Sequence, residues 1–169
     1  MKFEYTHEFS HPVERIERLM THPEINRVMT ERMSTIIGTE VKSRADEGSV
    51  VRRKVLYRPE PLIKSVGPIK VEPRWMEWVE ESSYDYGRHE GHFVNTPVIG
   101  QIAEKMVNNG TVRITATSKG CRRVLSGELT VKIFIVGKIA EKIIASTAEK
   151  ILKEEADLLE KLASSGELG

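Results

Sequence analysis

Histidine and cysteine are the side chains that most readily bind metals or attack a substrate, and this 169-residue chain holds five histidines and one cysteine. His89 and His92 stand three residues apart on an expected strand, where alternation directs them to opposite faces. The other histidines are His7, His11 and His22. Because no group of His, Cys, Asp and Glu has the spacing of a ligand set, the sequence predicts no metal site.

Motifs for nucleophilic and nucleotide chemistry are also missing from the sequence. There is no Gly-x-Ser-x-Gly, and Cys121 lies in an expected turn without a catalytic partner. There is no Gly-x-Gly-x-x-Gly and no phosphate loop. We therefore expect no cofactor and assign no catalytic residue.

Two carboxylates, Glu128 and Glu154, would act as general acid or base if burial raised their pKa. Glu128 alternates with the inward set that includes Leu129 and Val131, which favours solvent for its side chain. Glu154 belongs to the charged run 153–157, which is typical of a solvated helix end. We expect both carboxylates to be exposed.

Composition narrows the class of protein. With 26 Lys+Arg against 25 Asp+Glu, the net charge of +1 provides no steering toward nucleic acid. The longest apolar stretch, around 133–137, is far shorter than the roughly 20 residues of a membrane span, and residues 1–5 do not resemble a signal peptide. One cysteine cannot form an intramolecular disulfide, which fits a reducing compartment. We expect a cytoplasmic protein; the sequence carries no signal for its oligomeric state.

The N-terminal part predicts one strand and two short helices. Residues 1–10 alternate, with Phe3, Tyr5, His7 and Phe9 on one face. Residues 12–20 have helical spacing after a proline, and a second helix begins near Pro23.

The pattern in the middle of the chain predicts six further strands. They form expected hairpins over 34–57 and 75–95 and a strand pair over 111–133, with a proline-rich connection at 59–73 and a loop or short helix at 97–109. On the first of these strands the alternation places four residues on one face: Thr35, Ile37, Thr39 and Val41.

A long helix over Val136–Leu162 ends the fold, and residues 163–169 are expected to form a flexible tail. Runs of strands with helices at the ends indicate an α+β domain over 1–162, in which a curved seven-stranded antiparallel sheet wraps around the long helix. A cavity between helix and sheet follows from this geometry. Eight residues are expected to face it: Tyr5, Tyr57, Trp78, Phe93, Ile114, Leu129, Ile143 and Thr147.

The order of elements resembles the START-like (SRPBCC) superfamily, which has the helix-grip fold shared by polyketide cyclases, the birch-pollen allergen family and lipid-transfer domains. Residues 1–14, MKFEYTHEFSHPVE, and residues 131–142, VKIFIVGKIAEK, are similar to the first strand and to the last strand and long helix of a bacterial START-like family of unknown function. A weaker likeness to PRELI-type phospholipid-transfer domains lies in the order of elements.

The resemblance implies binding, and in some members transport, of a hydrophobic small molecule or lipid in the cavity. The alternatives it implies are a polyketide cyclase or dehydratase-like enzyme, which would need converging polar groups in the cavity, and a protein-interaction domain like the START-like chaperone activators, which predicts an exposed apolar patch without a pocket. Residues 42–74 hold nine Lys/Arg against four Asp/Glu. With the apolar tip formed by Leu62-Ile63 and Val66-Gly67-Pro68-Ile69, they suggest a lid that touches an anionic membrane surface transiently. A solvated hairpin and loop is the reading we favour there.

Overall fold

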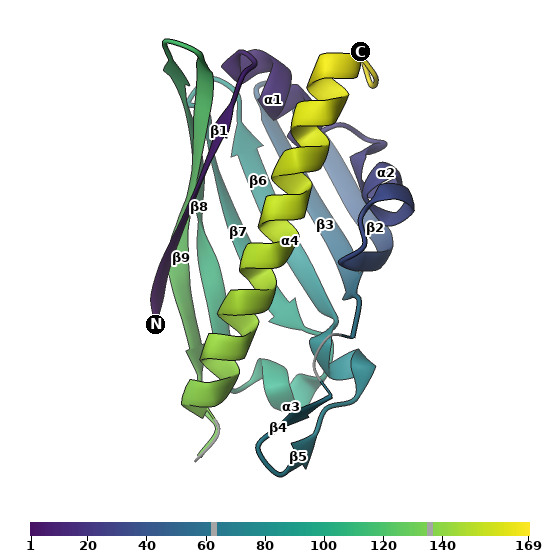
Figure 1. Cartoon of the computed structure of the whole chain (residues 1–169), viewed down its shortest axis with the longest axis vertical. Coiled ribbons are helices and arrows are strands. Elements are labelled where there is room, and N and C mark those ends of the chain that lie inside the picture. Colours follow the sequence, from purple (N-terminus) through teal and green to yellow (C-terminus); the bar gives the residue numbers. More distant parts are fainter. Residues whose placement is uncertain (62–63, 135–136) are drawn as a thin grey trace.

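The computed structural model describes residues 1–61, 64–134 and 137–169. Within these residues an antiparallel sheet of seven strands, in the order β1-β9-β8-β7-β6-β3-β2, curves behind one long helix, α4 (Figure 1). The strands are β1 (Lys2–Phe9), β2 (Ile36–Glu47), β3 (Val50–Pro59), β6 (Trp78–Asp85), β7 (Glu90–Pro97), β8 (Met106–Thr117) and β9 (Gly120–Val131).

The helices and short elements lie around this sheet. They are α1 (Val13–Met20), α2 (Ile25–Arg32), β4 (Ser65–Val66), β5 (Ile69–Lys70), η1 (Pro73–Met76), α3 (Gly100–Ala103) and α4 (Gly137–Ser165). Both α1 and α2 stand between β1 and β2, and α4 crosses the concave face of the sheet obliquely (Figure 1). The expected helix-grip α+β fold is confirmed.

The core lies where the C-terminal end of α4 meets α1. Leu159 and Leu162 of α4 are fully buried, as are Ile16 and Leu19 on the apolar stripe of α1. Full burial of one such side chain contributes about 1.5–3 kcal/mol, so this cluster anchors the end of α4.

The N-terminal half of α4 is attached to the opposite edge of the sheet by hydrogen bonds. The Glu141 carboxylate accepts from the backbone N–H of Val131, with a nitrogen–oxygen distance of 2.9 Å. The Tyr5 hydroxyl of β1 donates to the carbonyl of Ala145, also at 2.9 Å. Because both ends of α4 are attached to the rest of the fold, its middle spans the concave face of the sheet.

One expected strand phase is wrong. In β2 the register shifts between Ile36 and Gly38 and again between Val41 and Ser43, as β-bulges do. An extra residue in a strand reverses which residues face inward, and Ile37 is accordingly 56% exposed while Ile36 is buried. Val41 pairs with the buried Val55 and keeps the inward phase; it is 45% exposed because β2 is the edge strand. Alternation read without the first bulge placed Ile37 on the same face as Thr39 and Val41.

The stretch 97–109 and the C-terminal residues 163–169 also bear on the expectations from the sequence. The undecided stretch 97–109 contains the short helix α3 and the beginning of β8, which starts at Met106. The chain end expected to be a flexible tail makes contacts: Glu167 forms an ion pair with Arg32 at 2.6 Å, and Leu168 packs against the core.

Two paired glycines, Gly110 of β8 and Gly127 of β9, leave part of the concave face without side chains. A Cβ atom on Gly127 would lie 2.1 Å from the Asn109 carbonyl oxygen and 2.7 Å from the ring of Phe3. A Cβ atom on Gly110 would lie 2.8 Å from the ring of Phe93. The missing side chains therefore make room for aromatic rings that lie directly on the sheet.

Of the proposed membrane-touching tip, Leu62-Ile63 lies outside the described residues, and residues 66–69 span the turn between β4 and β5, where Ile69 is 38% exposed. The described elements of the connection are the two-residue strands β4 and β5 and the single turn η1. None of the helices that the structure describes combines the length and apolarity that crossing a membrane requires.

Candidate functional site

A cavity of about 110 Å³ lies between the concave face of the sheet and the middle of α4. Its apolar lining comes from α2, the central strands and α4: Ile25, Met29, Phe93, Val112, Leu125 and Leu152. Its polar lining includes Arg53, Tyr57, Glu80, Ser82, Arg123 and Glu155. Apolar walls with a few polar groups are typical of ligand sites.

An ion pair joins the sheet to α4 across this cavity. Arg123 Nη1 of β9 lies 2.9 Å from Glu155 Oε2, and the side chains are 1% and 19% exposed. Arg123 Nη2 lies 3.3 Å from His7 Nδ1, and the guanidinium carbon lies 5.6 Å from the centre of the Phe9 ring. Burial, and then the charge of Arg123, lower the pKa of His7, so its neutral ring can accept this hydrogen bond.

A carboxyl group and a tyrosine line the same cavity on neighbouring strands. Burial raises the pKa of Glu80, against the opposing effects of the Arg53 charge and a hydrogen bond with Ser82. Burial also raises the pKa of Tyr57, and the charge of Glu80 adds to the effect. A proton is thus held more tightly on both groups than in water.

Tyr57 is fixed by two contacts. Asn26 Nδ2 of α2 donates to the Tyr57 hydroxyl oxygen at 3.1 Å. The Tyr57 ring stacks on Trp78, with ring centroids 5.2 Å apart. Because the oxygen accepts from Asn26, the hydroxyl hydrogen of Tyr57 is available to a further acceptor.

Three buried polar atoms have no hydrogen-bond partner among the described residues: Trp78 Nε1, Asn95 Oδ1 and Arg123 Nε. Arg123 lines the cavity. Trp78 precedes the lining residue Glu80 by two positions on β6, and Asn95 follows the lining residue Phe93 by two on β7, so both share the inward face. Buried polar groups in native proteins are nearly always paired, which makes this group unusual.

Glu17 is a second buried carboxylate; it does not line the cavity but contacts Tyr84, which does. Glu17 Oε2 of α1 accepts from the Tyr84 hydroxyl at 3.0 Å and lies 2.9 Å from His89 Nδ1. Burial and the charge of Glu17 raise the pKa of Tyr84. His89 has a φ of 51°, a left-handed conformation within the β6–β7 turn. This cluster fastens the turn to α1.

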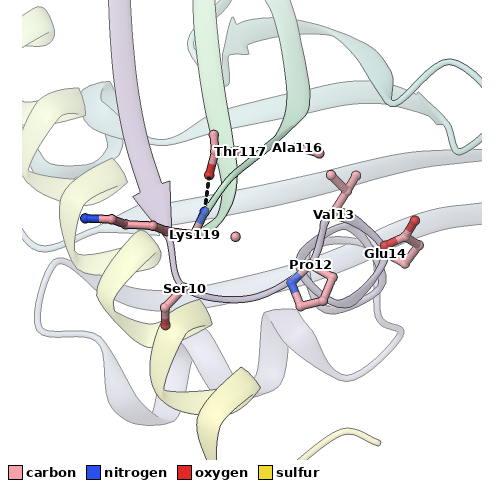
Figure 2. A pocket seen from close by; sticks show the side chains of 8 residues that line it. Ser10, Pro12, Val13, Glu14, Ala116, Thr117 and Lys119 are labelled. Carbon is pink, nitrogen blue, oxygen red and sulfur yellow. Dashed lines mark hydrogen bonds between the residues drawn. The ribbon is translucent and has the colours of Figure 1, made fainter.

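A shallow hollow of about 380 Å³ lies between the start of α1 and the β8–β9 turn (Figure 2). The Lys119 backbone N–H donates to Thr117 Oγ1 at 3.4 Å, and the charged side chains of Lys119 and Glu14 extend away from each other (Figure 2). The polar side chains that line this hollow do not point toward a common position where a ligand could be held. Across the described ranges, no three His, Cys, Asp or Glu side chains come together as metal ligands.

The eight residues expected from the sequence occupy three kinds of position. Tyr57 and Phe93 line the cavity, with Trp78 stacked on Tyr57. The others are distributed outside the lining. Ile114 and Leu129 are buried, Ile143 and Thr147 are half-buried on α4, and Tyr5 ties β1 to α4.

The two carboxylates singled out in the sequence have different surroundings. Glu128 is exposed, as its strand phase predicts. Glu154 is half-buried and accepts hydrogen bonds from the backbone N–H groups of Ser34 and Thr35 at 2.6 and 2.9 Å. Burial acts to raise the pKa of Glu154, but these hydrogen bonds outweigh it and the pKa is lowered. The charged run 153–157 was therefore a poor guide to Glu154, which joins α4 to the α2–β2 connection.

The charged residues of the cavity were missed at the level of sequence, although alternation marks them. Arg53 shares its phase with Tyr57, Glu80 with Trp78, and Arg123 with Leu125. A charged residue in the inward phase of a strand is a signal that could have found all three.

Much of the positive charge in 42–58 is matched by neighbouring carboxylates. The ion pairs are Lys42–Glu40, Arg44–Asp46, Arg52–Glu47 and Lys54–Glu81. The basic excess of the wider segment 42–74 thus overstates the free positive charge of its first hairpin.

Solved structures share this fold at low sequence identity. The chain is similar to the protein TTHA0849 from Thermus thermophilus, with a TM-score of 0.69, 19% identity and 99% of each chain covered. It is similar to the Zhui aromatase/cyclase from Streptomyces sp. R1128, with a TM-score of 0.67, 10% identity and 96% and 94% of the two chains covered. A START superfamily protein from Mycobacterium smegmatis has a TM-score of 0.59 at 14% identity, with 95% and 98% covered.

These likenesses concern the fold, and they confirm the resemblance to the START-like superfamily. No curated protein sequence gives a significant match. One family model matches residues 4–162, which is nearly the whole chain. By this match the chain belongs to the family described as Protein of unknown function (DUF2505).

Proposed function

We propose that the protein binds a compact, largely apolar small molecule in the cavity between the sheet and α4. The observation that carries the proposal is the lining itself, in which apolar side chains such as Phe93 and Leu152 surround a few buried polar groups. The folds of the aromatase/cyclase and the START superfamily protein are compatible with such a site.

The size of the cavity bears on which ligands enter without rearrangement. Pockets for drug-sized molecules hold roughly 300–1,000 Å³, whereas an apolar cavity of about 150 Å³ accepts benzene. At about 110 Å³ the cavity is smaller than that, so one small ring is the upper limit for a ligand that enters without rearrangement. A lipid chain, or its transport, would require the middle of α4 to move away from the sheet and to break the Arg123–Glu155 ion pair.

Titration with neutral ketones of increasing size tests the proposal. Cyclohexanone, 1-tetralone and 2-dodecanone are added to ¹⁵N-labelled protein, and amide shifts are followed by NMR. We expect cyclohexanone to perturb residues around Phe93 and Leu125, with weaker or no binding of 2-dodecanone. Absence of saturable binding by all three would contradict the proposal.

A matched pair of variants locates the binding. Val112 and Val107 lie on the same strand, β8, but Val112 lines the cavity while Val107 faces outward and is 37% exposed. Val112→Phe should fill the cavity and abolish binding of cyclohexanone, and Val107→Phe should leave it intact. Equal effects of the two substitutions would place the bound ketone elsewhere.

A cyclase or dehydratase activity is the second candidate function, and Glu80 beside Tyr57 favours it. A carboxylate with a raised pKa can remove a proton next to a ketone, and the free Tyr57 hydroxyl hydrogen can stabilise the oxygen that gains charge. An internal aldol reaction then forms a carbon–carbon bond, and loss of the hydroxyl group with a proton releases water. The model substrate 2,6-heptanedione would give 3-methylcyclohex-2-enone and one water.

Ultraviolet absorbance of the enone product measures that reaction. We expect Glu80→Gln to remove the activity while leaving cyclohexanone binding unchanged, because Gln keeps the shape of the side chain. Activity that survives Glu80→Gln would assign the reaction to another group. Activity lacking in the unsubstituted protein would leave binding as the function.

The remaining expectations are proposals about context. We place the protein in the cytoplasm because its single cysteine fits a reducing compartment, and we expect no nucleic acid partner because its net charge is +1. A role in protein interaction alone is less well supported than ligand binding, because that role predicts a domain without a lined cavity. Transient membrane contact through 59–73 would show as co-sedimentation with anionic vesicles, and loss of sedimentation with neutral vesicles would attribute it to charge.

A further inference from the structure

Among the buried polar atoms without partners in and beside the cavity, donors outnumber acceptors. Among the described residues, Arg123 Nε and Trp78 Nε1 are buried donors without partners, and the hydroxyl hydrogen of Tyr57 has no recorded acceptor. The one unpaired buried acceptor in the same part of the chain is Asn95 Oδ1. A guest that supplies an acceptor atom would remove the cost of leaving these donors unpaired.

The formal charges of the Arg and Glu side chains that line the cavity balance when both carboxyl groups are ionised. Two guanidinium groups, Arg53 and Arg123, stand with two carboxyl groups, Glu80 and Glu155. Arg123 is paired directly with Glu155, and His7 is the other titratable group in contact with it. A charged guest would bring a further charge into this space without a matching partner.

We propose that the ligand of this cavity presents an uncharged acceptor oxygen, such as a ketone carbonyl, to the Nε–H of Arg123 and the hydroxyl of Tyr57. This inference rests on the proposed binding function and specifies its ligand class. A single small ring that carries a carbonyl is about the largest guest that the volume of about 110 Å³ allows. Arg123 therefore has two roles: its Nη atoms hold α4 and β1, and its Nε selects the guest.

Three probes of nearly equal shape separate the possibilities: cyclohexanone, methylenecyclohexane and cyclohexanecarboxylate. Methylenecyclohexane replaces the carbonyl oxygen by a CH₂ group, and the carboxylate adds a negative charge. The measurement is NMR titration of the Arg123 Nε–Hε signal in the unsubstituted protein. We expect cyclohexanone to shift this signal, methylenecyclohexane to leave it in place, and cyclohexanecarboxylate to bind at least about tenfold more weakly than cyclohexanone.

Substitution of the donor supplies a second measurement. Arg123→Lys keeps a cation opposite Glu155 but removes the Nε–H group. It should weaken cyclohexanone binding about tenfold, the effect of one hydrogen bond, and change methylenecyclohexane binding less than about twofold. The control is Arg122→Lys, because Arg122 is 52% exposed on the opposite face of β9. If Arg123→Lys fails to fold, the Nε–Hε titration alone still decides.

The outcomes distinguish this inference from the function on which it rests. If the ring probes bind but cyclohexanone does not shift the Nε–Hε signal, or if the carboxylate binds most tightly, the binding function stands and the ligand class is wrong. If none of the probes binds in the cavity, the binding function fails and this inference fails with it.

Discussion

Replacement of Glu155 by Gln should destabilise the protein far more than loss of an exposed ion pair. Removal of one partner of a buried pair costs about 3–5 kcal/mol, because the other charge is left in a poorly solvated place. Arg123 is 1% exposed and Glu155 is 19% exposed, and the Gln oxygen can still accept one hydrogen bond. We therefore expect the lower end, about 3 kcal/mol. For a chain of this length that corresponds to a fall in Tm of roughly 6–12 °C.

Urea unfolding followed by circular dichroism measures the change in the free energy of unfolding. Glu31→Gln is the matched control, since Glu31 pairs with Arg27 at 2.7 Å on the surface of α2 with both side chains about half exposed. It should change stability little. The double variant Arg123→Met with Glu155→Met should recover most of the loss, because it leaves no unpaired buried charge. Equal, small losses for Glu155→Gln and Glu31→Gln would refute the idea that the ion pair across the cavity is buried in solution.

Three further results are expected. Glu154→Gln should reduce stability near about pH 7, and by less as the pH falls below the usual carboxyl range. The folded-state pKa of Glu154 is lowered, so its stabilising effect is present above that range and is lost as pH falls through the lowered value; urea unfolding over a pH series would check this. Gly127→Ala should cost at least about 2 kcal/mol in thermal unfolding, because its Cβ would lie 2.1 Å from a backbone oxygen, whereas Gly100→Ala, with open space around it, should cost little. Burial raises the pKa of Cys121 to about 11 and the residue is fully buried, so a thiol reagent should label it only at the rate of unfolding; fast labelling of the folded protein would contradict the described packing.

The sequence predicted the elements of the fold well because their patterns are local. Alternation in 1–10 marked β1, and helical spacing without proline or internal glycine marked α4. The phase of β2 was wrong because a bulge depends on how the partner strand pairs, which alternation along one strand cannot reveal.

The candidate site was harder to predict than the fold. Tyr57 and Phe93 were placed in the lining from their strand phases, but the polar members were passed over because charged residues were expected at the surface. Whether Arg123 meets Glu155 depends on how α4 crosses β9, and no spacing in the sequence encodes that crossing. The long-range hydrogen bonds of Glu154 and Glu17 were unpredictable for the same reason.

The position of β1 in the sheet has a kinetic consequence. Lys2–Phe9 pair with residues 121–128 of β9, so β1 is synthesised more than 100 residues before its partner strand and has to wait for it. Hairpins such as β2–β3 and β6–β7 can close much earlier because their partners are adjacent in sequence. The β1 edge of the sheet should therefore form late in folding, and until then the unpaired backbone edge of β9 is exposed to association with other unfinished chains.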